Sequence, residues 1–504
     1  MLGKDQKGAA FTFFKPAKVE AGKLSGMDFH AGHNGAPVLN EAIAAVECSV
    51  KQIVAMGDHD IVVGEVTEAY VMQPPSGRPD AAILEMKDLG DNVYYGGSPL
   101  PGRAARPRAW PRPDSKGNPM FREFATVYPG HIDLPDHGQN ATPANERRFS
   151  NEQLAGVFAK TEAVAKLMDR TGWDTLWMAE HHFQYEGYEV IPNLLMAAVH
   201  LCHLTTKLKI GCGFNIAPMW HPLRLAEDYA VADILTKGRT VFGVGRGYHS
   251  REVETFGAPI LNQEANRELF EEQVEIIFKA FNNESFSHKG RHYTLPPEVP
   301  YRGYTLKELT LVPRPVNRPV ECWQPVVSAS ARGLDFMIKY GIKGAVGGGA
   351  ATMREGPIAA YREAAARAGI DLKLGQNLML GIFVHLADTK EKAVKELRPL
   401  YEEHAKMFAP LGFVPGVTPA QVEAIARRGG WDEAGVPTLD HFMKLGSWFA
   451  GTPEELIAYL KELEDRYPGM EHINISTPMS APESVMLEQL GWVAEAVMPK
   501  FKKA

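Results

Sequence analysis

Side chains that could transfer protons or bind anions follow short apolar runs at several points in the middle of the chain. The run 175–178 leads directly to Glu180, His181 and His182, and a later run ends just before Arg246. An imidazole suits proton transfer near neutral pH, because its unperturbed pKa lies close to that range. An arginine between glycines lets the backbone approach a ligand and offers a planar fork that matches phosphate. We therefore expect acid–base chemistry and anion binding here.

Short apolar runs alternate with amphipathic helical patterns along most of the chain, which predicts parallel strands with crossover helices. Chemistry on such sheets gathers at the carboxyl ends of the strands, where these polar residues fall. Eight alternations predict a (β/α)8 barrel, interrupted near 284–322 and 408–450, and the second insertion is long enough to be a lid. The expected strands are 121–128, 175–178, 208–217, 240–244, 325–328, 343–346, 377–385 and 472–476. The expected helices are 152–169, 192–203, 223–235, 265–281, 334–340, 357–368, 390–407 and 453–463.

Composition excludes several classes of protein. The chain has 504 residues, of which 45% are hydrophobic and 23% charged, and these values are typical of a globular protein. A net charge of −7 provides no basic surface for nucleic acid. Neither a leader nor an apolar run of membrane-spanning length is visible, so we expect a cytoplasmic protein. The four cysteines are scattered, with neither metal-ligand nor disulfide spacing.

The first 98 residues differ from the rest. Alternating apolar residues in 45–50 and 61–66, around a turn at 57–58, predict a small, mainly β extension. Residues 99–119 are rich in proline and glycine and predict a linker, which leaves 120–504 for the barrel.

Three segments carry a family resemblance: WDTLWMAEHHF, HPLRLAEDYAVADILTKGR and FGVGRGYHSREVETFG. With later motifs in the same order over about 121–499, the chain resembles the bacterial luciferase-like monooxygenase family. The resemblance implies a TIM barrel of that type. It also implies a homodimer and a reaction in which reduced FMN captures dioxygen as a C4a-(hydro)peroxyflavin and oxidises a small organic substrate.

The resemblance also assigns roles to the acid–base residues. His181 holds the position of the family's base, and His182 and Glu180 would support it. Neighbouring side chains on extended backbone face opposite ways, so only one histidine can point squarely into the site. Two alternatives stay open: the histidines pack the barrel mouth, or they bind a metal, although no third ligand is evident at suitable spacing.

The flavin phosphate has three expected contacts. Arg246 matches a family arginine that reaches the phosphate, and Arg267 matches another. Ser328 and Ser330 precede a helix whose start favours an anion, with Ser330 at the better match. The alternatives are a surface pair of Arg246 with an acidic neighbour (Glu252 or Glu254), a solvated Arg267, and simple N-capping by Ser330.

Two further residues concern the flavin ring. Asn215 would hydrogen-bond the isoalloxazine edge, or equally well satisfy a buried backbone group. Gly245 stands where bacterial luciferase has a cysteine, so chemistry tied to that thiol does not carry over. Five aromatic or sulfur-containing residues that follow barrel strands suggest an apolar substrate pocket: Phe183, Tyr185, Tyr188, Met219 and Trp220.

The amino-terminal text GAPVL, ECSV and GDHDIVVGEV resembles the carboxyl-terminal half of a flavin reductase-like split barrel. The half that supplies much of that family's flavin site has no counterpart here. A separate NAD(P)H-dependent flavin reductase is therefore implied, and His59 is either a remnant of the reductase site or a plain loop histidine. Two alternative functions stay open: a deazaflavin-dependent oxidoreductase on the same barrel, and a non-enzymatic flavin-binding protein.

Overall fold

The computed structural model describes residues 2, 6–13, 17–56, 59–74, 84, 121–327, 329–347 and 351–502. Its contacts divide the chain into two units, Met1–Ser115 and Lys116–Ala504. The linker expected at 99–119, Ser328 and the side chain of His59 lie outside the part of the chain that the structure describes.

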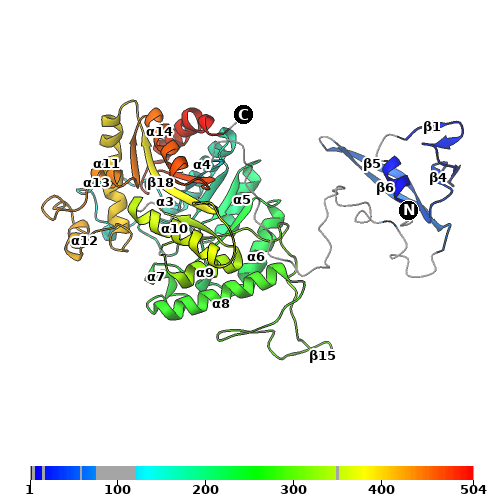
Figure 1. Cartoon of the computed structure of the whole chain (residues 1–504), viewed down its shortest axis with the longest axis horizontal. Helices are drawn as coiled ribbons and strands as arrows, with labels where there is room; N and C mark the ends of the chain where they lie inside the picture. Colours follow the sequence, from blue (N-terminus) through cyan, green and yellow to red (C-terminus); the bar gives the residue numbers. More distant parts are fainter. Residues whose placement is uncertain are drawn as a thin grey trace. The chain divides into compact units, whose positions relative to one another are not determined.

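Eight parallel strands close into a barrel in the larger unit (Figure 1). Each strand pairs with the next along the chain, β9 and β10 together act as the third strand, and β20 pairs back with β7. This confirms the predicted (β/α)8 barrel. The barrel strands are β7 (Glu123–Val127), β8 (Thr175–Met178), β9 (Lys209–Cys212), β10 (Asn215–Ile216), β11 (Thr240–Gly245), β16 (Cys322–Pro325), β17 (Lys343–Val346), β18 (Leu378–Leu386) and β20 (His472–Ser476).

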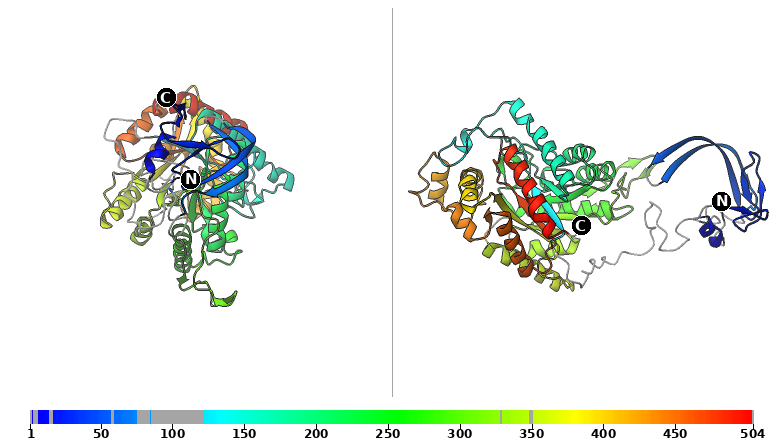
Figure 2. Two further views of the ribbon diagram at one scale, coloured as in Figure 1. Left: turned by 90° about the vertical axis from the view of Figure 1, so that its right-hand side faces the viewer. Right: turned by 90° about the horizontal axis from the view of Figure 1, so that it is seen from above.

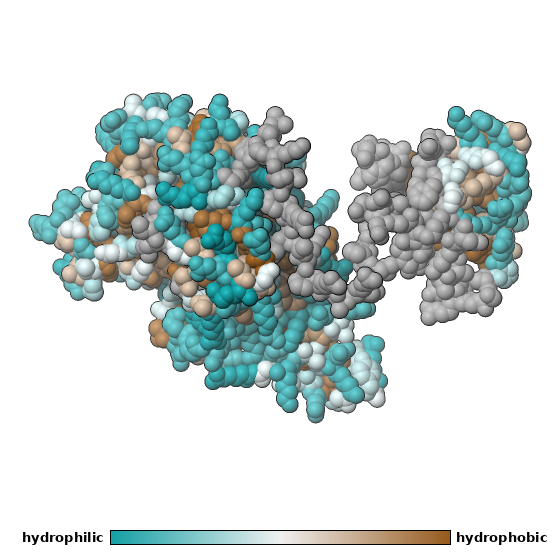
Figure 3. Space-filling view, in the orientation of Figure 1, coloured by the Kyte–Doolittle hydropathy of each residue, from teal (hydrophilic) through white to brown (hydrophobic). Residues whose placement is uncertain are grey.

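Helices surround these strands on the outside (Figure 2). Capping boxes at Ser150 and Thr452 start two of them, and apolar stripes such as Val164, Ala165 and Met168 of α4 are fully buried. Hydrophilic residues cover the face over α8 (Figure 3). The helices around the barrel are α3 (Asn151–Ala155), α4 (Val157–Thr171), α5 (Leu194–Leu204), α6 (Pro222–Leu235), α7 (Ser250–Val253), α8 (Gln263–Asn282), α9 (Ala331–Tyr340), α10 (Ala351–Arg367), α11 (Lys390–Phe408), α14 (Pro453–Arg466) and α15 (Glu483–Trp492). None of the described helices is both long and apolar enough to cross a membrane.

The fifth barrel strand begins earlier than the sequence pattern predicted. It covers Cys322–Pro325 rather than 325–328. Cys322 and Trp323 are each 1% exposed and lie in the core, whereas Val327 is 73% exposed. The apolar residues Val326 and Val327 therefore belong to the loop that follows the strand.

The insertion after α11 forms a lid, by which we mean residues 408–447. It contains α12 (Pro419–Ile425) and α13 (Leu439–Lys444), and it leads into β19 (Trp448–Gly451), which pairs with the end of β18. The lid has a small core of its own, where Ile425, Trp431 and Val436 pack on Ala405 of α11 and on Ala409, the residue that follows this helix. The other insertion holds two short antiparallel pairs, β12 (His288–Lys289) with β13 (Thr294–Leu295) and β14 (Pro300–Tyr301) with β15 (Tyr304–Thr305).

The smaller unit is mainly β, with one short helix, α1 (Lys7–Thr12). Its longest elements, β5 (Ala44–Met56) and β6 (His59–Val71), form the antiparallel hairpin that the sequence predicted. Glu47 is buried and accepts hydrogen bonds from the backbone N–H groups of Asn34 and His33, which lower its pKa to about 2. The remaining strands are β1 (Val19–Glu20), β2 (Lys23–Leu24), β3 (Phe29–Ala31) and β4 (Pro37–Leu39).

A buried charge cluster fastens α11, the helix that carries the lid, to the barrel. Glu403 is 0% exposed, and its carboxylate accepts hydrogen bonds from Arg147 Nε at 3.1 Å and from the Tyr188 hydroxyl. Lys406 Nζ lies 2.6 Å from the other carboxylate oxygen. Removal of the central carboxylate would leave Lys406 as a buried cation without an ion-pair partner, whereas Arg147 would keep Asp136 at 2.9 Å.

Glu403→Gln should lower the free energy of unfolding of the larger unit by about 3–5 kcal/mol, because breaking a buried ion pair leaves a buried charge unpaired. Denaturant titration followed by circular dichroism measures this change. Glu423→Gln on α12 breaks only an exposed pair with Arg427 and should change stability by less than about 0.5 kcal/mol. Equal effects of the two substitutions would show that the cluster does not hold the lid helix.

Candidate active site

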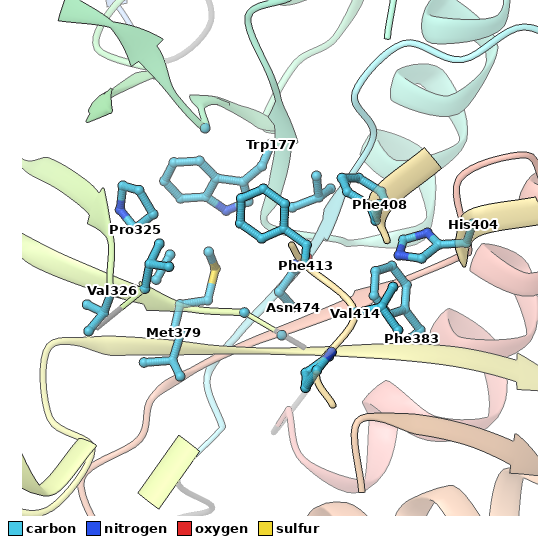
Figure 4. Close-up of a pocket in the computed structure, with 18 of the residues that line it drawn as sticks. Trp177, Pro325, Val326, Met379, Phe383, His404, Phe408, Phe413, Val414 and Asn474 are labelled. Carbon is cyan, nitrogen blue, oxygen red and sulfur yellow. The ribbon is translucent and has the colours of Figure 1, made fainter. Parts of the chain in front are cut away.

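A pocket of about 440 Å³ opens where the strands of the barrel end and the lid begins (Figure 4). Its walls come from the carboxyl ends of several strands, including Trp177, Phe214 and Val326, from residues along β18 such as Met379 and Phe383, and from the lid. The volume lies within the range of small-molecule sites. The strands thus converge on a ligand-sized space.

The described lining of this pocket is almost entirely apolar. It contains no Asp, Glu, Lys or Arg, and its few polar side chains are Asn474, Tyr401 and His404. Asn474 Oδ1 accepts a hydrogen bond from Ser476, and the Tyr401 hydroxyl donates to the carbonyl of Pro437. Such walls suit a flat, uncharged group and exclude water.

Glu180 ties the end of β8 to the end of β10. It is 1% exposed, and it accepts hydrogen bonds from the backbone N–H of Ile216 at 2.7 Å and from Trp220 Nε1 at 2.8 Å. His182 Nε2 lies 3.1 Å from the same carboxylate. Glu180 and His182 therefore form one positioning unit that shapes the loop after the barrel strand.

His181 faces the opposite way, as alternation along extended backbone predicts. Its Nδ1 atom lies 3.2 Å from Glu252, and its Nε2 atom lies 3.1 Å from the hydroxyl of Tyr248 and 3.2 Å from Glu189. Gln184 donates a further hydrogen bond to Glu252 at 2.7 Å. Each ring nitrogen of His181 thus meets an acceptor.

This arrangement favours the protonated imidazole. Burial alone would lower the pKa of His181, but the negative charges of Glu189 and Glu252 outweigh it and raise the pKa above the ordinary value. Burial and Glu189 hold the pKa of Tyr248 well above its usual range, so this hydroxyl keeps its proton and can donate to Glu189. His181 is consequently prepared to give up a proton, and it becomes a base only after losing one.

The same cluster contains a possible third metal ligand, which spacing alone did not offer. Among the described residues, ligand atoms of His181, Glu189 and His249 lie within 4.8 Å of one another, and all three are buried. Their atoms already pair with each other, since His249 Nε2 lies 3.0 Å from Glu189. Because these side chains hydrogen-bond to one another, the cluster is complete as a proton-sharing network without a metal ion.

A second group of residues brings positive charge to the start of α9. Arg246 spans the first turn of α8, where it donates to Asn266 Oδ1 at 2.9 Å and to the carbonyl of Gln263 at 2.7 Å. The alternative expectation, a surface ion pair of Arg246 with Glu252 or Glu254, does not occur among the described contacts. Burial and the charge of Arg267 lower the pKa of Arg246, as expected for crowded cations.

Ser330 stands at the N-cap position of α9, yet its side chain makes no capping hydrogen bond. A Cβ atom added to Gly333 would lie 2.9 Å from Ser330 Oγ and 3.3 Å from Arg267 Nη1. These three residues therefore surround a small space that a side chain would fill. Arg267 forms no ion pair with a described residue, although Arg332 beside it pairs with Glu264 and Glu271. Uncapped N–H groups and a guanidinium fit an anion here.

Asn215 and Gly245 lie at the ends of neighbouring strands. Asn215 is 0% exposed, and its amide donates to the carbonyl of Gly243 at 2.9 Å, so it satisfies a buried backbone group. Its Oδ1 atom is buried and has no partner among the described residues. A Cβ on Gly245 would lie 3.3 Å from both Ile216 Cδ1 and Phe214 Cβ, which leaves little room for a larger residue.

The predicted residues thus form two groups around the pocket without lining it. His181, Arg246, Ser330 and Asn215 are absent from its described walls. Asn215 follows Gly213 and Phe214, which do line it, and the wall residues Val326 and Val327 begin the loop that ends at Ser330. The sequence also suggested five residues for a substrate pocket, and the described lining contains none of them: Phe183, Tyr185, Tyr188, Met219 and Trp220. The aromatic wall comes instead from Trp177, Phe214 and the lid.

FMN would fit these two regions. Arg246, Arg267, Ser330 and the start of α9 provide donors for a doubly charged phosphate, and the glycine at 333 leaves space between two of them. The apolar pocket between Trp177 and Val326 provides flat walls for an isoalloxazine ring. Bound there, FMN would supply electrons and activate dioxygen.

Comparison with protein families gives two matches. Residues 130–468 match the model of the luciferase-like monooxygenase family, and residues 1–86 match that of the flavin reductase-like domain.

Individual relatives match over shorter stretches. The alkanal monooxygenase alpha chain of the Kryptophanaron alfredi symbiont is 29% identical over 185 residues, which cover 36% of this chain and 49% of that protein. The oxygenase component of the flavin-dependent trigonelline monooxygenase of Acinetobacter baylyi is 26% identical over 174 residues, or 34% and 44% of the two chains. The chain thus spans less than half the length of these curated relatives.

A solved structure shows the same fold. The oxygenating constituent of 3,6-diketocamphane monooxygenase from Pseudomonas putida, in complex with FMN, has a TM-score of 0.56 and 17% identity. The similarity covers 76% of this chain and all of the other.

The pKa of His181 should fall when Glu252 is replaced by Gln, because one of the charges that raises it is removed. Histidine-ring NMR during a pH titration measures the pKa, and the His181 signal is identified by its loss in His181→Gln. Because the folded pKa is raised, the stabilisation from these ion pairs is present below about pH 6.5 and is lost as the pH rises through the folded pKa.

Glu254→Gln serves as the matched control, since Glu254 is exposed on the same segment and does not contact His181. An unchanged His181 pKa in Glu252→Gln would contradict the electrostatic account of the cluster.

Proposed function

The chain belongs to the luciferase-like monooxygenase family, and on that basis we propose that it is a flavin-dependent monooxygenase. It uses reduced FMN and dioxygen to oxidise a small organic substrate. The observation that carries this proposal is the combination of a pocket without charged residues in its described walls and a group of two arginines with an uncapped helix start one loop away.

Each part of the site has a role in this reaction. The start of α9, with Arg246 and Arg267, holds the FMN phosphate and so fixes the position of the ring. The apolar walls and the lid exclude water, which protects the activated oxygen until it meets substrate. His181 exchanges a proton at Nε2, through Tyr248 and Glu189, as charge changes in the pocket. Glu180 and His182 keep the loop that carries His181 in place.

Reduced FMN comes from a separate NAD(P)H-dependent reductase. The amino-terminal unit resembles the carboxyl-terminal half of a flavin reductase-like split barrel. The similarity of the larger unit to a protein described as an oxygenase component supports a separate reductase. We further propose a homodimer through α5 and α6, since Met196 is 73% exposed and Leu235 is 51% exposed on these helices.

The proposed function is tested by mixing the anaerobic protein, chemically reduced FMN and candidate substrates with ¹⁸O₂. A monooxygenase gives product that is heavier by one labelled oxygen atom and depends on the protein. Binding of a deazaflavin with hydride transfer and no labelled product would favour the dehydrogenase alternative. Flavin binding without any product from the tested substrates would favour a binding protein.

His181→Ala and His181→Gln should retain FMN affinity and lose substrate oxidation by about 10²–10⁴-fold, because one acid–base group typically contributes that much. Gln preserves hydrogen bonding to the surrounding carboxylates and therefore separates chemistry from stability. His203→Gln on the exposed end of α5 is the control. Turnover of both variants within a few-fold of the parent would rule out His181 as the proton-transfer group.

Arg246→Ala and Ser330→Ala should weaken FMN more than riboflavin, because riboflavin lacks the phosphate. The loss of a charge-assisted contact should cost about 1.5–3 kcal/mol for Arg246, measured by calorimetric titration. Arg224→Ala, which breaks an exposed pair with Glu227 and Asp228 on α6, should leave both affinities unchanged. If riboflavin and FMN lose affinity equally, these residues do not hold the phosphate.

The purified chain should show negligible reduction of FMN by NADH or NADPH, because its amino-terminal unit resembles the carboxyl-terminal half of the split barrel and not the half that supplies much of the flavin site. Addition of an independent flavin reductase should restore oxygenation, followed by substrate consumption. Substantial NADH oxidation by the chain alone, abolished by His59→Ala, would show instead that the amino-terminal unit is a working reductase.

A further inference from the structure

The pocket has a second half that the flavin would not need. We call it the lid half: it is made by the end of β18, by α11, by residues 408–415 and by β19. In Figure 4 His404, Phe383 and Phe408 lie at the end opposite Pro325 and Val326. Phe413, Phe442 and Trp448 complete its walls, so that six aromatic rings surround this part of the cavity.

The imidazole of His404, in the lid half, has hydrogen-bonding capacity that the described residues leave unused. Its ring packs on Phe383 at 4.6 Å, on Phe408 at 4.5 Å and on Trp448 at 5.1 Å between centroids. Its Nδ1 atom is buried and has no partner among the described residues. Buried polar groups in folded proteins are nearly always paired, and His404 lines the pocket, so a ligand bound there can supply the hydrogen-bond partner that the imidazole lacks among the described residues.

The ring of His404 is uncharged at neutral pH. Burial among aromatic side chains lowers its pKa to about 3. A neutral imidazole offers one donor and one acceptor, which matches a hydroxyl group. Since no charged side chain is present in the described lining, a charged ligand would lose its hydration without compensation.

We propose that the lid half is the substrate subsite, and that it selects an uncharged aromatic compound whose hydroxyl group hydrogen-bonds to the imidazole of His404. The rings supply offset and edge-to-face contacts for a flat molecule, and His404 sets its orientation. This inference rests on the proposed function, because the half of the pocket near Trp177 is assigned to the flavin ring. His404 is then a specificity-determining residue, distinct from the proton-transfer group His181.

Calorimetric titration of the FMN-saturated protein with four probes tests the proposal. 2-Naphthol should bind at least about fivefold more tightly than naphthalene, the value of one hydrogen bond. 2-Naphthoate and 1-decanol should both bind more weakly than 2-naphthol, since one is charged and the other is not flat. In His404→Phe the preference for 2-naphthol over naphthalene should fall below about twofold, with naphthalene affinity unchanged.

His441→Phe on α13 is the matched control, because His441 is exposed and does not line the pocket. A second readout covers the case in which His404→Phe is unstable: ring-nitrogen NMR of the parent should show one histidine shifting on addition of 2-naphthol, and that signal should be missing in His404→Gln. The proposal is overturned if 2-naphthol does not bind, if the preference survives in His404→Phe, or if 2-naphthoate or 1-decanol binds as tightly as 2-naphthol.

Failure of this inference can be told apart from failure of the proposed function. FMN and riboflavin affinities are measured on the same samples, and the naphthol titration is repeated without flavin. Normal FMN binding without a preference for 2-naphthol overturns the lid-half assignment alone. A His404-dependent preference in a protein that binds no FMN upholds the aromatic site and overturns the monooxygenase.

Discussion

Closure of the parallel strands into a barrel is the constraint on which the rest of the structure depends. It brings the carboxyl ends of all the strands to one rim, so that residues as distant in sequence as Trp177, Val326 and the lid residue Phe413 line a single pocket. The core below that rim is apolar and tightly packed, as the contact between Trp177 and Trp323 illustrates. Polar chemistry is therefore confined to the rim and the loops above it.

At this rim the charged side chains lie outside the pocket, and the side chains that line the pocket are almost all apolar. Carboxylates and imidazoles around His181 neutralise one another in a buried network beside the strand ends. The arginines collect at the start of α9, where helix N–H groups add to the positive potential. In the proposed function, this separation would let one continuous set of loops hold both the phosphate and the neutral ring of the flavin, with the ring in a pocket that excludes water.

Sequence reasoning identified the barrel and the loops that carry chemistry, because alternating strands and helices leave a strong periodic pattern. It also anticipated that His181 and His182 would face opposite ways, since alternation follows from backbone geometry. It could not find Glu252 as the partner of His181, because 71 positions separate them and only the closed barrel brings them together. His404 was hidden for a similar reason: within an amphipathic helix it looks like any polar residue, and only the folded lid shows which face meets the pocket.

A crystal structure of the protein with FMN tests the central claim most directly. The account predicts phosphate oxygens within hydrogen-bonding distance of Arg246 or Arg267 and of the first backbone N–H groups of α9. It also predicts the isoalloxazine ring between Trp177 and Val326, with the lid half left free for substrate. A phosphate bound away from α9, or a ring that lies outside this pocket, would contradict the account.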